Sequence, residues 1–278
     1  MKVLFSFPVL ALLAGCSAPR SILWDGTVAK PGKLRVQADQ VVALPTASLG
    51  PYFDVLAGDV EPAGELERTR LRQLARAAVA ASLDMPGMAI DMSVRVGLGA
   101  GLELGGRYVA GNKGGELRWQ FLEGEPGGWN GGVGLGYMRN SYEAPGGSAD
   151  VLGLEMTRQD FLIPLAFGVQ SGDRSGFHTN YGIGAGLAIT RIEYAFTPTV
   201  DVNLDAEIRR AEVVPKAHEN YASVGVHGMI QPGWNWFHLT FGASVWHTDY
   251  GTYRIPDMDP ISLQGWTVLP SFGVALKF

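Results

Sequence analysis

Apolar side chains alternate with small or polar side chains along most of this 278-residue chain. In the last segment, Trp266, Val268 and Val274 share one face in steps of two, and Thr267 and Ala275 share the other. A period of two is typical of a β-strand, because successive side chains point to opposite faces of a sheet. The chain is therefore predicted to be all-β.

The same alternation returns throughout the chain, separated by stretches rich in glycine, proline and polar residues. Counted this way, the sequence predicts about ten strands, with eight to twelve as the range. Several short, regularly spaced strands are typical of an all-β sandwich or barrel, and alternation alone does not decide between the two. The alternating segments are 34–44, 90–98, 102–108, 117–121, 133–137, 161–169, 181–189, 222–230, 237–245 and 266–278.

Composition excludes several classes of protein. The formal net charge is −5, from 22 basic and 27 acidic residues, whereas a nucleic-acid-binding protein needs a basic surface. A single cysteine excludes a disulfide scaffold and a cysteine-rich metal site. Because 46% of the residues are hydrophobic and only 18% are charged, the chain is not a disordered polymer.

The N-terminus carries an export signal. Lys2 precedes an apolar run over residues 3–13, which ends in Leu13-Ala14-Gly15-Cys16. This resembles the lipobox of bacterial lipoproteins. The resemblance implies a signal peptide over 1–15, cleavage before Cys16, covalent lipid on that residue and handling by the lipoprotein-sorting machinery. Ser17, in place of the aspartate that retains such proteins in the inner membrane, favours the outer membrane.

The C-terminus carries a second signal. Phe272, Val274, Leu276 and Phe278 share one face of the last strand, and Leu269 is an exception on the opposite face. A terminal aromatic residue after such a series resembles the assembly signal of bacterial outer-membrane β-barrels. The resemblance implies a transmembrane barrel over 33–278, assembled by the barrel-assembly machinery and surrounded by outer-membrane lipid. A soluble lipoprotein sandwich would show the same alternation and remains the structural alternative.

The connections support this orientation. Counted back from a periplasmic Phe278, the outer connections are mostly longer than the inner ones, as in known membrane barrels. An even strand number then places both termini in the periplasm, with residues 16–32 as a lipidated periplasmic tail that leads to the first strand. Residues 65–83 have helical spacing and are predicted as a helix in the first outer loop.

Charged residues of both signs fall on the inward face of the strands. A barrel of about ten strands has a small interior that side chains largely fill. The balanced charges therefore favour an ion-paired, closed lumen, and the rival hypothesis is a charged constriction of a narrow pore. Gly-x-Gly runs at 132–136 and 182–186 leave room in that lumen. The predicted lumen charges are Arg35, Asp39, Asp91, Arg95, Glu103, Arg107, Arg118 and Asp160.

No motif predicts a catalytic site, a metal site or a cofactor other than the lipid on Cys16. His247–Asp249 and Asp257–Asp259 resemble the paired residues of outer-membrane proteases of the omptin family, but both fall in one loop and the order is reversed. His178 lacks the serine of a lipid A deacylase. His227 and His238 point inward on adjacent strands, but two histidines without a third ligand make a poor metal site.

Aromatic residues lie near the predicted strand ends, which suits the aromatic girdles of a membrane barrel. They are Trp119, Trp129, Tyr137, Tyr142, Trp236, Trp246, Tyr250 and Trp266. The sequence thus predicts a monomeric, non-enzymatic outer-membrane barrel that is structural or a narrow small-solute channel. The alternatives are a surface-binding barrel that acts through its long loops and an outer-membrane hydrolase.

Overall fold

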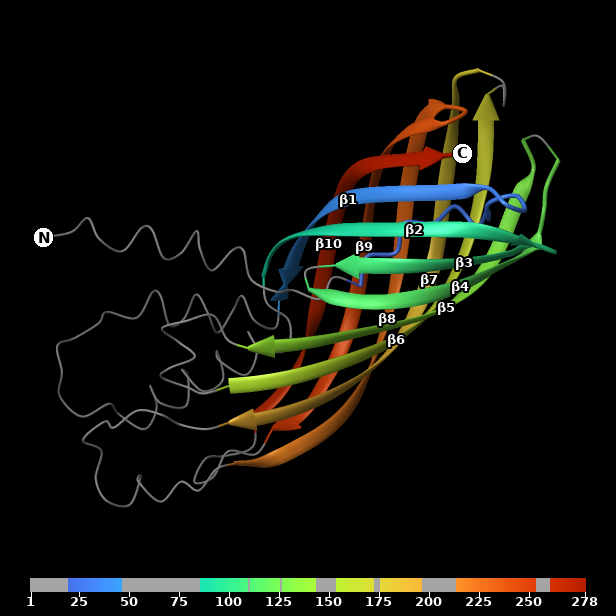
Figure 1. The fold of residues 1–278 in the computed structure, drawn as a ribbon. Coiled ribbons are helices and arrows are strands. Elements are labelled where there is room, and N and C mark those ends of the chain that lie inside the picture. The colour runs from blue at the N-terminus through green and yellow to red at the C-terminus, as the bar shows by residue number, and fades with distance from the viewer. Residues whose placement is uncertain are drawn as a thin grey trace, which may run out of the picture.

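The computed structural model describes residues 20–46, 86–109, 111–125, 127–143, 154–172, 176–196, 214–253 and 261–278. In this part of the chain, ten antiparallel strands close into one barrel (Figure 1), which confirms the predicted fold class. The strands are β1 (Leu34–Pro45), β2 (Gly87–Gly99), β3 (Leu102–Val109), β4 (Asn112–Leu122), β5 (Trp129–Glu143), β6 (Leu154–Gly172), β7 (His178–Phe196), β8 (Val214–Trp234), β9 (Phe237–Tyr253) and β10 (Ile261–Lys277).

Each strand pairs with its sequence neighbours, and β1 also pairs with β10, which closes the barrel. This last pairing runs from Arg35 opposite Lys277 to Pro45 opposite Thr267. A closed sheet leaves no edge of unpaired N–H and C=O groups. Because each unpaired group costs several kcal/mol in lipid, closure is what allows a sheet to cross a membrane.

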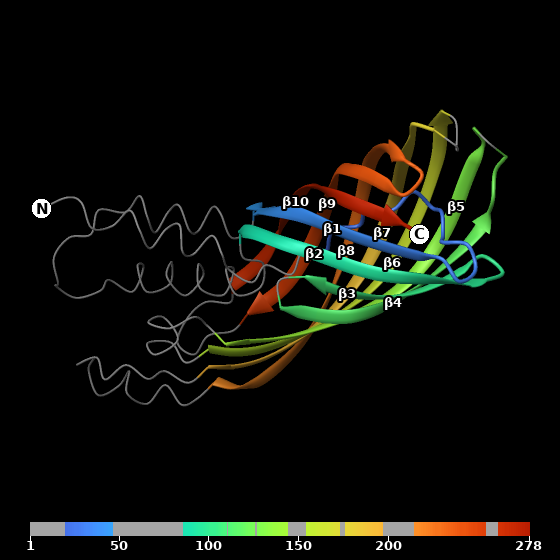
Figure 2. The ribbon, with the colours of Figure 1, turned by 45° about the horizontal axis from the view of Figure 1, so that its top comes forward.

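The two ends of the barrel differ in the lengths of their connections. At one end, β2–β3 and β8–β9 are joined by two residues each, and the C-terminus lies at this end (Figure 2). We call it the short-turn end. At the opposite end, the connections after β1, β5 and β7 cover 46–86, 144–153 and 197–213. We call this the long-loop end.

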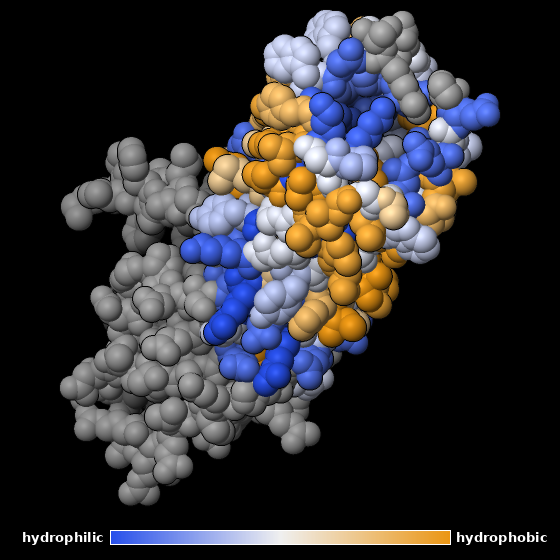
Figure 3. Space-filling model, turned by 45° about the vertical axis from the view of Figure 1, so that its right-hand side comes forward, coloured by the Kyte–Doolittle hydropathy of each residue, from blue (hydrophilic) through white to orange (hydrophobic). Residues whose placement is uncertain are grey.

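The barrel is apolar outside and polar inside. On β2, Ile90 and Val94 are 59% and 52% exposed, whereas Asp91 and Arg95 are buried. Hydrophobic residues gather over the visible exterior, with polar residues toward its ends (Figure 3). A water-soluble protein keeps its charged residues on the surface, whereas a transmembrane barrel has an apolar outer band and a polar interior. The described barrel is therefore built to span a membrane.

A charge on the outer face should destabilise the barrel according to its depth in the membrane. Ile183 is the sixth residue of β7 and 58% exposed, and a strand crosses a bilayer in about 9–11 residues. Ile183→Arg should therefore cost about 2–4 kcal/mol of unfolding free energy, as for a midplane charge. Leu239 is outward-facing but only the third residue of β9, so Leu239→Arg should cost less.

Urea titration of the barrel folded into lipid vesicles measures both effects, with Ile183→Ala as the control for lost side-chain volume. Equal destabilisation by the two arginines would contradict this placement of the membrane.

The C-terminal strand has the predicted faces. Phe272, Val274 and Phe278 are exposed on the outside, and Leu269 is 1% exposed on the lumen side. Leu269, the exception to the alternation, is thus an apolar residue of the interior. The predicted role of Phe272, Val274, Leu276 and Phe278 as an assembly signal stays a prediction.

None of the described residues forms a helix long and apolar enough to cross a membrane. The predicted signal peptide, Cys16 and the predicted helix over 65–83 lie outside the described residues.

Candidate functional site

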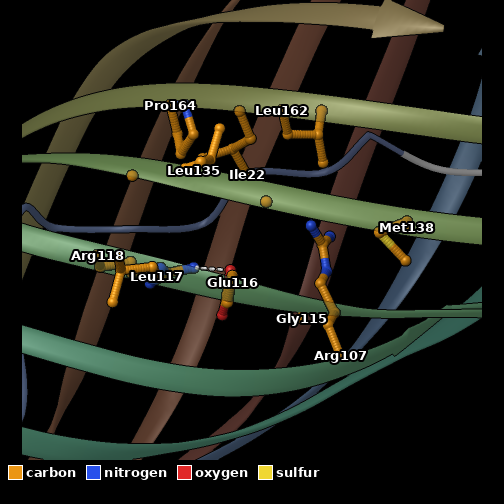
Figure 4. Close-up of a pocket in the computed structure, with 12 residues that line it drawn as sticks. Ile22, Arg107, Gly115, Glu116, Leu117, Arg118, Leu135, Met138, Leu162 and Pro164 are labelled. Carbon is orange, nitrogen blue, oxygen red and sulfur yellow. Dashed lines mark hydrogen bonds and ion pairs between the residues drawn. The ribbon is translucent and has the colours of Figure 1, made fainter.

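A ten-residue segment lies inside the barrel, and we call residues 20–29 the lumen segment. It follows no regular secondary structure. Arg20, Trp24 and Asp25 are only 5%, 1% and 3% exposed, although no strand or helix contains them. Figure 4 shows Ile22 of this segment among side chains of β4, β5 and β6. The chain therefore fills its own lumen.

The lumen segment is fixed to the wall at the short-turn end. The chain first pairs with β2, where Gly32 N donates to Gly97 O at 2.9 Å. Ala29 N then donates to Glu103 Oε2 at 2.7 Å, and Val28 N donates to a side-chain oxygen of β4 at 3.0 Å. Side-chain acceptors thus satisfy backbone N–H groups that have no strand partner.

Trp24 occupies the middle of the segment. Its indole Nε1 donates to Thr27 O at 2.7 Å, and the guanidinium carbon of Arg118 lies 4.8 Å from the ring centroid. That distance is within the range of a cation–π contact. The ring is 1% exposed, so it blocks the lumen at this level.

The segment continues away from the short-turn end. Ile22 N donates to Ser244 Oγ at 3.1 Å. Beyond it, Arg20 donates to Ser223 Oγ at 2.7 Å and to Thr248 Oγ1 at 2.9 Å, and it lies 3.7 Å from the carboxylate of Asp160. With a further hydrogen bond to Thr190 Oγ1 at 3.3 Å, Arg20 joins the four neighbouring strands β6 to β9.

Inward-facing glycines make room for the segment. A Cβ atom on Gly132 would lie 2.6 Å from the ring of Trp24, and one on Gly186 would lie 2.8 Å from Ile22 Cδ1. Real Cβ contacts are not this short, so these positions accept no side chain without displacing the segment. The Gly-x-Gly runs leave room, as expected, and the room is occupied by residues 20–29.

The eight charged residues predicted for the lumen all face inward. Seven are buried as whole residues, and the Arg107 side chain is 8% exposed. The guanidinium of Arg107 pairs with the carboxylate of Asp91, and Arg95 lies 3.9 Å from Glu103. Asp39 accepts a hydrogen bond from Gln37 at 2.6 Å. The structure thus brings these residues into one polar interior.

Four further charges complete this interior. Glu116 pairs with Arg95 and, at 3.0 Å, with Arg118. On β6, Arg158 bonds Asp160 at 2.8 Å. The other two come from the lumen segment, where Asp25 lies 3.7 Å from Arg35 and Arg20 lies beside Asp160.

Ser21 links the lumen segment to the central ion pair. Its hydroxyl donates to Asp91 Oδ2 at 2.5 Å, and Arg107 donates to its carbonyl oxygen at 2.5 Å. The wall and the segment therefore share one set of hydrogen bonds.

A small cavity lies beside the segment. A cavity of about 20 Å³ is lined by Ile22, Arg107, Glu116, Arg118 and Met138, among others (Figure 4). One water molecule needs about 10–15 Å³ of such volume. This cavity therefore has room for about one water molecule and not for a solute.

The position of the lumen segment differs from the sequence-based expectation. Residues 16–32 are expected to form a periplasmic tail, but residues 20–29 lie inside the barrel, where they meet the polar wall and its glycines. The physical reason is that an otherwise hollow lumen of this size would leave its charges unpaired and its glycine-lined space empty.

The described histidine side chains lie in two places, inside the lumen and on the outer face. His238 Nε2 lies 2.9 Å from His178 Nε2, not beside His227 as the sequence suggested. His247 packs edge to face against Trp266 on the outer face, with ring centroids 4.8 Å apart. No described group of three or more potential ligands is arranged to hold a metal ion, and Asp257 and Asp259 lie outside the described residues.

Two aromatic residues assigned to the girdles lie elsewhere. Trp246 and Tyr250 are each 1% exposed and face the lumen, whereas Trp119, Trp129 and Trp266 face outward. Proximity to a strand end does not decide which face a residue occupies, and the alternation along β9 does.

The sequence matches no protein-family model and no curated relative. Among solved structures, it is similar to Neisserial surface protein A (14% identity, 89% of this chain and 99% of that chain, TM-score 0.31). It is also similar to the outer membrane protein OprG from Pseudomonas aeruginosa (9% identity, 92% and 99%, TM-score 0.34). A third is the outer membrane protease OmpT from Escherichia coli (8% identity, 89% and 94%, TM-score 0.37). Values this low support no inference about activity.

Proposed function

We propose that this chain is a non-enzymatic β-barrel of a bacterial outer membrane with a closed lumen, and that its role is structural. The observation that carries the proposal is the buried lumen segment, with Trp24 in the middle and Arg20 bonded to four strands. A solute channel needs a continuous water-filled path. Residues 20–29 occupy the place where that path would run.

The orientation follows from the connections. Known barrels have short periplasmic turns and longer extracellular loops, so the short-turn end faces the periplasm. Lipid on Cys16 adds a second anchor, and the assembly partners are the lipoprotein-sorting and barrel-assembly machineries. A monomer is expected, because the outward faces of the strands are apolar and suited to lipid.

Conductance tests the closed lumen. The purified full chain in planar bilayers should give no ion conductance. A variant in which residues 20–29 are replaced by a Gly-Ser repeat of equal length should conduct, because it loses Trp24 and Arg20 but keeps the wall. Heat-modifiable gel mobility verifies that both barrels are folded. Stepwise conductance of the unaltered chain would favour the narrow channel instead.

Surface binding is a second candidate function, favoured by the connection lengths. The connections at the long-loop end cover up to 41 residues (46–86), against two residues for β2–β3 and β8–β9. A rigid closed barrel suits the display of such loops. Lipid and peptide hydrolysis by the detergent-solubilised chain should be absent, and turnover of either substrate would instead establish the hydrolase alternative.

A further inference from the structure

We propose that the chain passes through its own barrel, so that the residues before Arg20 leave the lumen at the long-loop end. This rests on the proposed function for one point only, the assignment of the long-loop end to the cell surface. The N-terminus would then lie outside the cell, and the sequence-based expectation of a periplasmic N-terminus would not hold.

The direction of the lumen segment is given by its partners on strands that begin at the short-turn end. Ala29 bonds Glu103, the second residue of β3. Five residues earlier in the sequence, Trp24 lies over Gly182, the fifth residue of β7. The chain is therefore further from the short-turn end at Trp24 than at Ala29.

The distance from the short-turn end increases further toward Arg20, the first residue of the segment. Ile22 bonds Ser244, the eighth residue of β9. Arg20 bonds Thr248, the twelfth residue of β9, and its guanidinium lies 3.3 Å from Thr190 Oγ1, on the thirteenth residue of β7. A barrel strand crosses a bilayer in about 9–11 residues. Arg20 has therefore reached the far boundary of the membrane.

Beside Ile22, the described residues leave too little room for a second pass of the chain. Between Arg20 and the short-turn end, the lumen contains the lumen segment and the ion pair of Arg107 with Asp91. It also contains Glu116 with its partners Arg95 and Arg118. The cavity beside Ile22 holds about 20 Å³, whereas a returning backbone needs the width of a second extended chain. On this proposal, the residues before Arg20 would continue outward.

The position of Arg20 also limits where Cys16 can lie. An extended chain covers at most about 3.6 Å per residue, so four residues reach about 14 Å from Arg20. The periplasmic leaflet lies on the far side of a hydrocarbon core about 30 Å thick. Lipid on Cys16 is thus within reach of the outer leaflet and out of reach of the periplasmic one.

Cysteine labelling in intact cells tests the threading. Ala18→Cys reports the residues before Arg20, Thr252→Cys reports the long-loop end of β9, and Gly176→Cys reports the turn between β6 and β7. Thr252 is exposed, and nothing lies within 4 Å of a Cβ on Gly176. Each variant is treated with a membrane-impermeant maleimide before and after permeabilisation of the outer membrane, with the unaltered chain as background.

Threading predicts that Ala18→Cys behaves like Thr252→Cys, and that both are labelled in intact cells. Gly176→Cys should be labelled only after permeabilisation. The proposal would be overturned if Ala18→Cys, like Gly176→Cys, were labelled only after permeabilisation. It would also be overturned by protection of Ala18→Cys under both conditions, which would place it inside the barrel, or by an intact mass showing a mature chain that starts after residue 18.

Failure of the proposed orientation gives a different result. If the long-loop end faced the periplasm, Gly176→Cys would be labelled in intact cells and Thr252→Cys would not. Threading would still require Ala18→Cys to follow Thr252→Cys, so the two proposals are tested separately.

Discussion

Arg107→Gln should lower the unfolding free energy by about 3–5 kcal/mol, the usual cost of removing one member of a buried ion pair. Asp39 and Asp91 lie opposite each other on β1 and β2, and Arg107 is the cation that pairs with Asp91. Without it, Asp91 loses the cation with which it pairs, beside a second carboxylate on Asp39. Urea unfolding of the vesicle-inserted barrel measures the loss.

A matched control is Arg191→Gln. Arg191 pairs with Glu193 at 3.1 Å, but its side chain is 48% exposed, and exposed pairs contribute about 0–1 kcal/mol. The double variant Arg107→Gln with Asp91→Asn should recover part of the stability, because it removes the unpaired carboxylate as well. Equal effects of the two arginine substitutions would indicate a wet lumen in which charges are screened.

Trp24→Ala should have an effect of similar size, about 3–5 kcal/mol, because it removes a buried indole and leaves a cavity. The control is Trp236→Ala, since Trp236 is 60% exposed in the turn between β8 and β9 and fills no internal space. The same urea titration compares the two.

A double-mutant cycle with Gly132 isolates the contact itself. Gly132→Ala should destabilise the unaltered chain, because its Cβ would lie 2.6 Å from the Trp24 ring. In the Trp24→Ala background, the same change should cost much less, because the ring is gone. Additive effects would show that Trp24 does not rest on Gly132.

The wall of the barrel was predictable from the sequence, because a strand with lipid on one side and a polar lumen on the other imposes a period of two. Ile90 and Asp91 follow that rule, and so do the residues along β10. Leu269 was recognised as an exception without a reason, and the structure supplies one, since it packs inside.

The lumen segment was not predictable in this way, because it has no periodic structure and its contacts are distant in sequence. The sequence carried only an indirect indication of this segment. Glycine at every second inward position indicated space, but nothing in the pattern indicated that Ile22 and Trp24 fill that space.

The lumen charges were predicted as a set, without assigned partners. Asp160 bonds Arg158 and lies beside Arg20, and Arg118 pairs with Glu116. Partners depend on the stagger between strands, which alternation leaves undetermined. Glu116 has the same parity as Arg118 and could have been assigned to the lumen by extending the predicted segment 117–121 by one residue.

The hydrogen bonds of Arg20 also constrain the order in which the molecule is assembled. Its partners Ser223 and Thr248 stand 203 and 228 residues later in the chain. The hydrogen bonds of Arg20, the first described residue, can therefore form only after β8 and β9 have been synthesised. The ring closes only when β1 meets β10. Contacts between distant parts of a chain slow folding, because the loop entropy is lost before they form. In the simplest folding order, residues 20–29 are already in place when β1 pairs with β10. If the barrel closed first, Trp24 and the Arg20 guanidinium would have to pass the buried ion pairs to enter it.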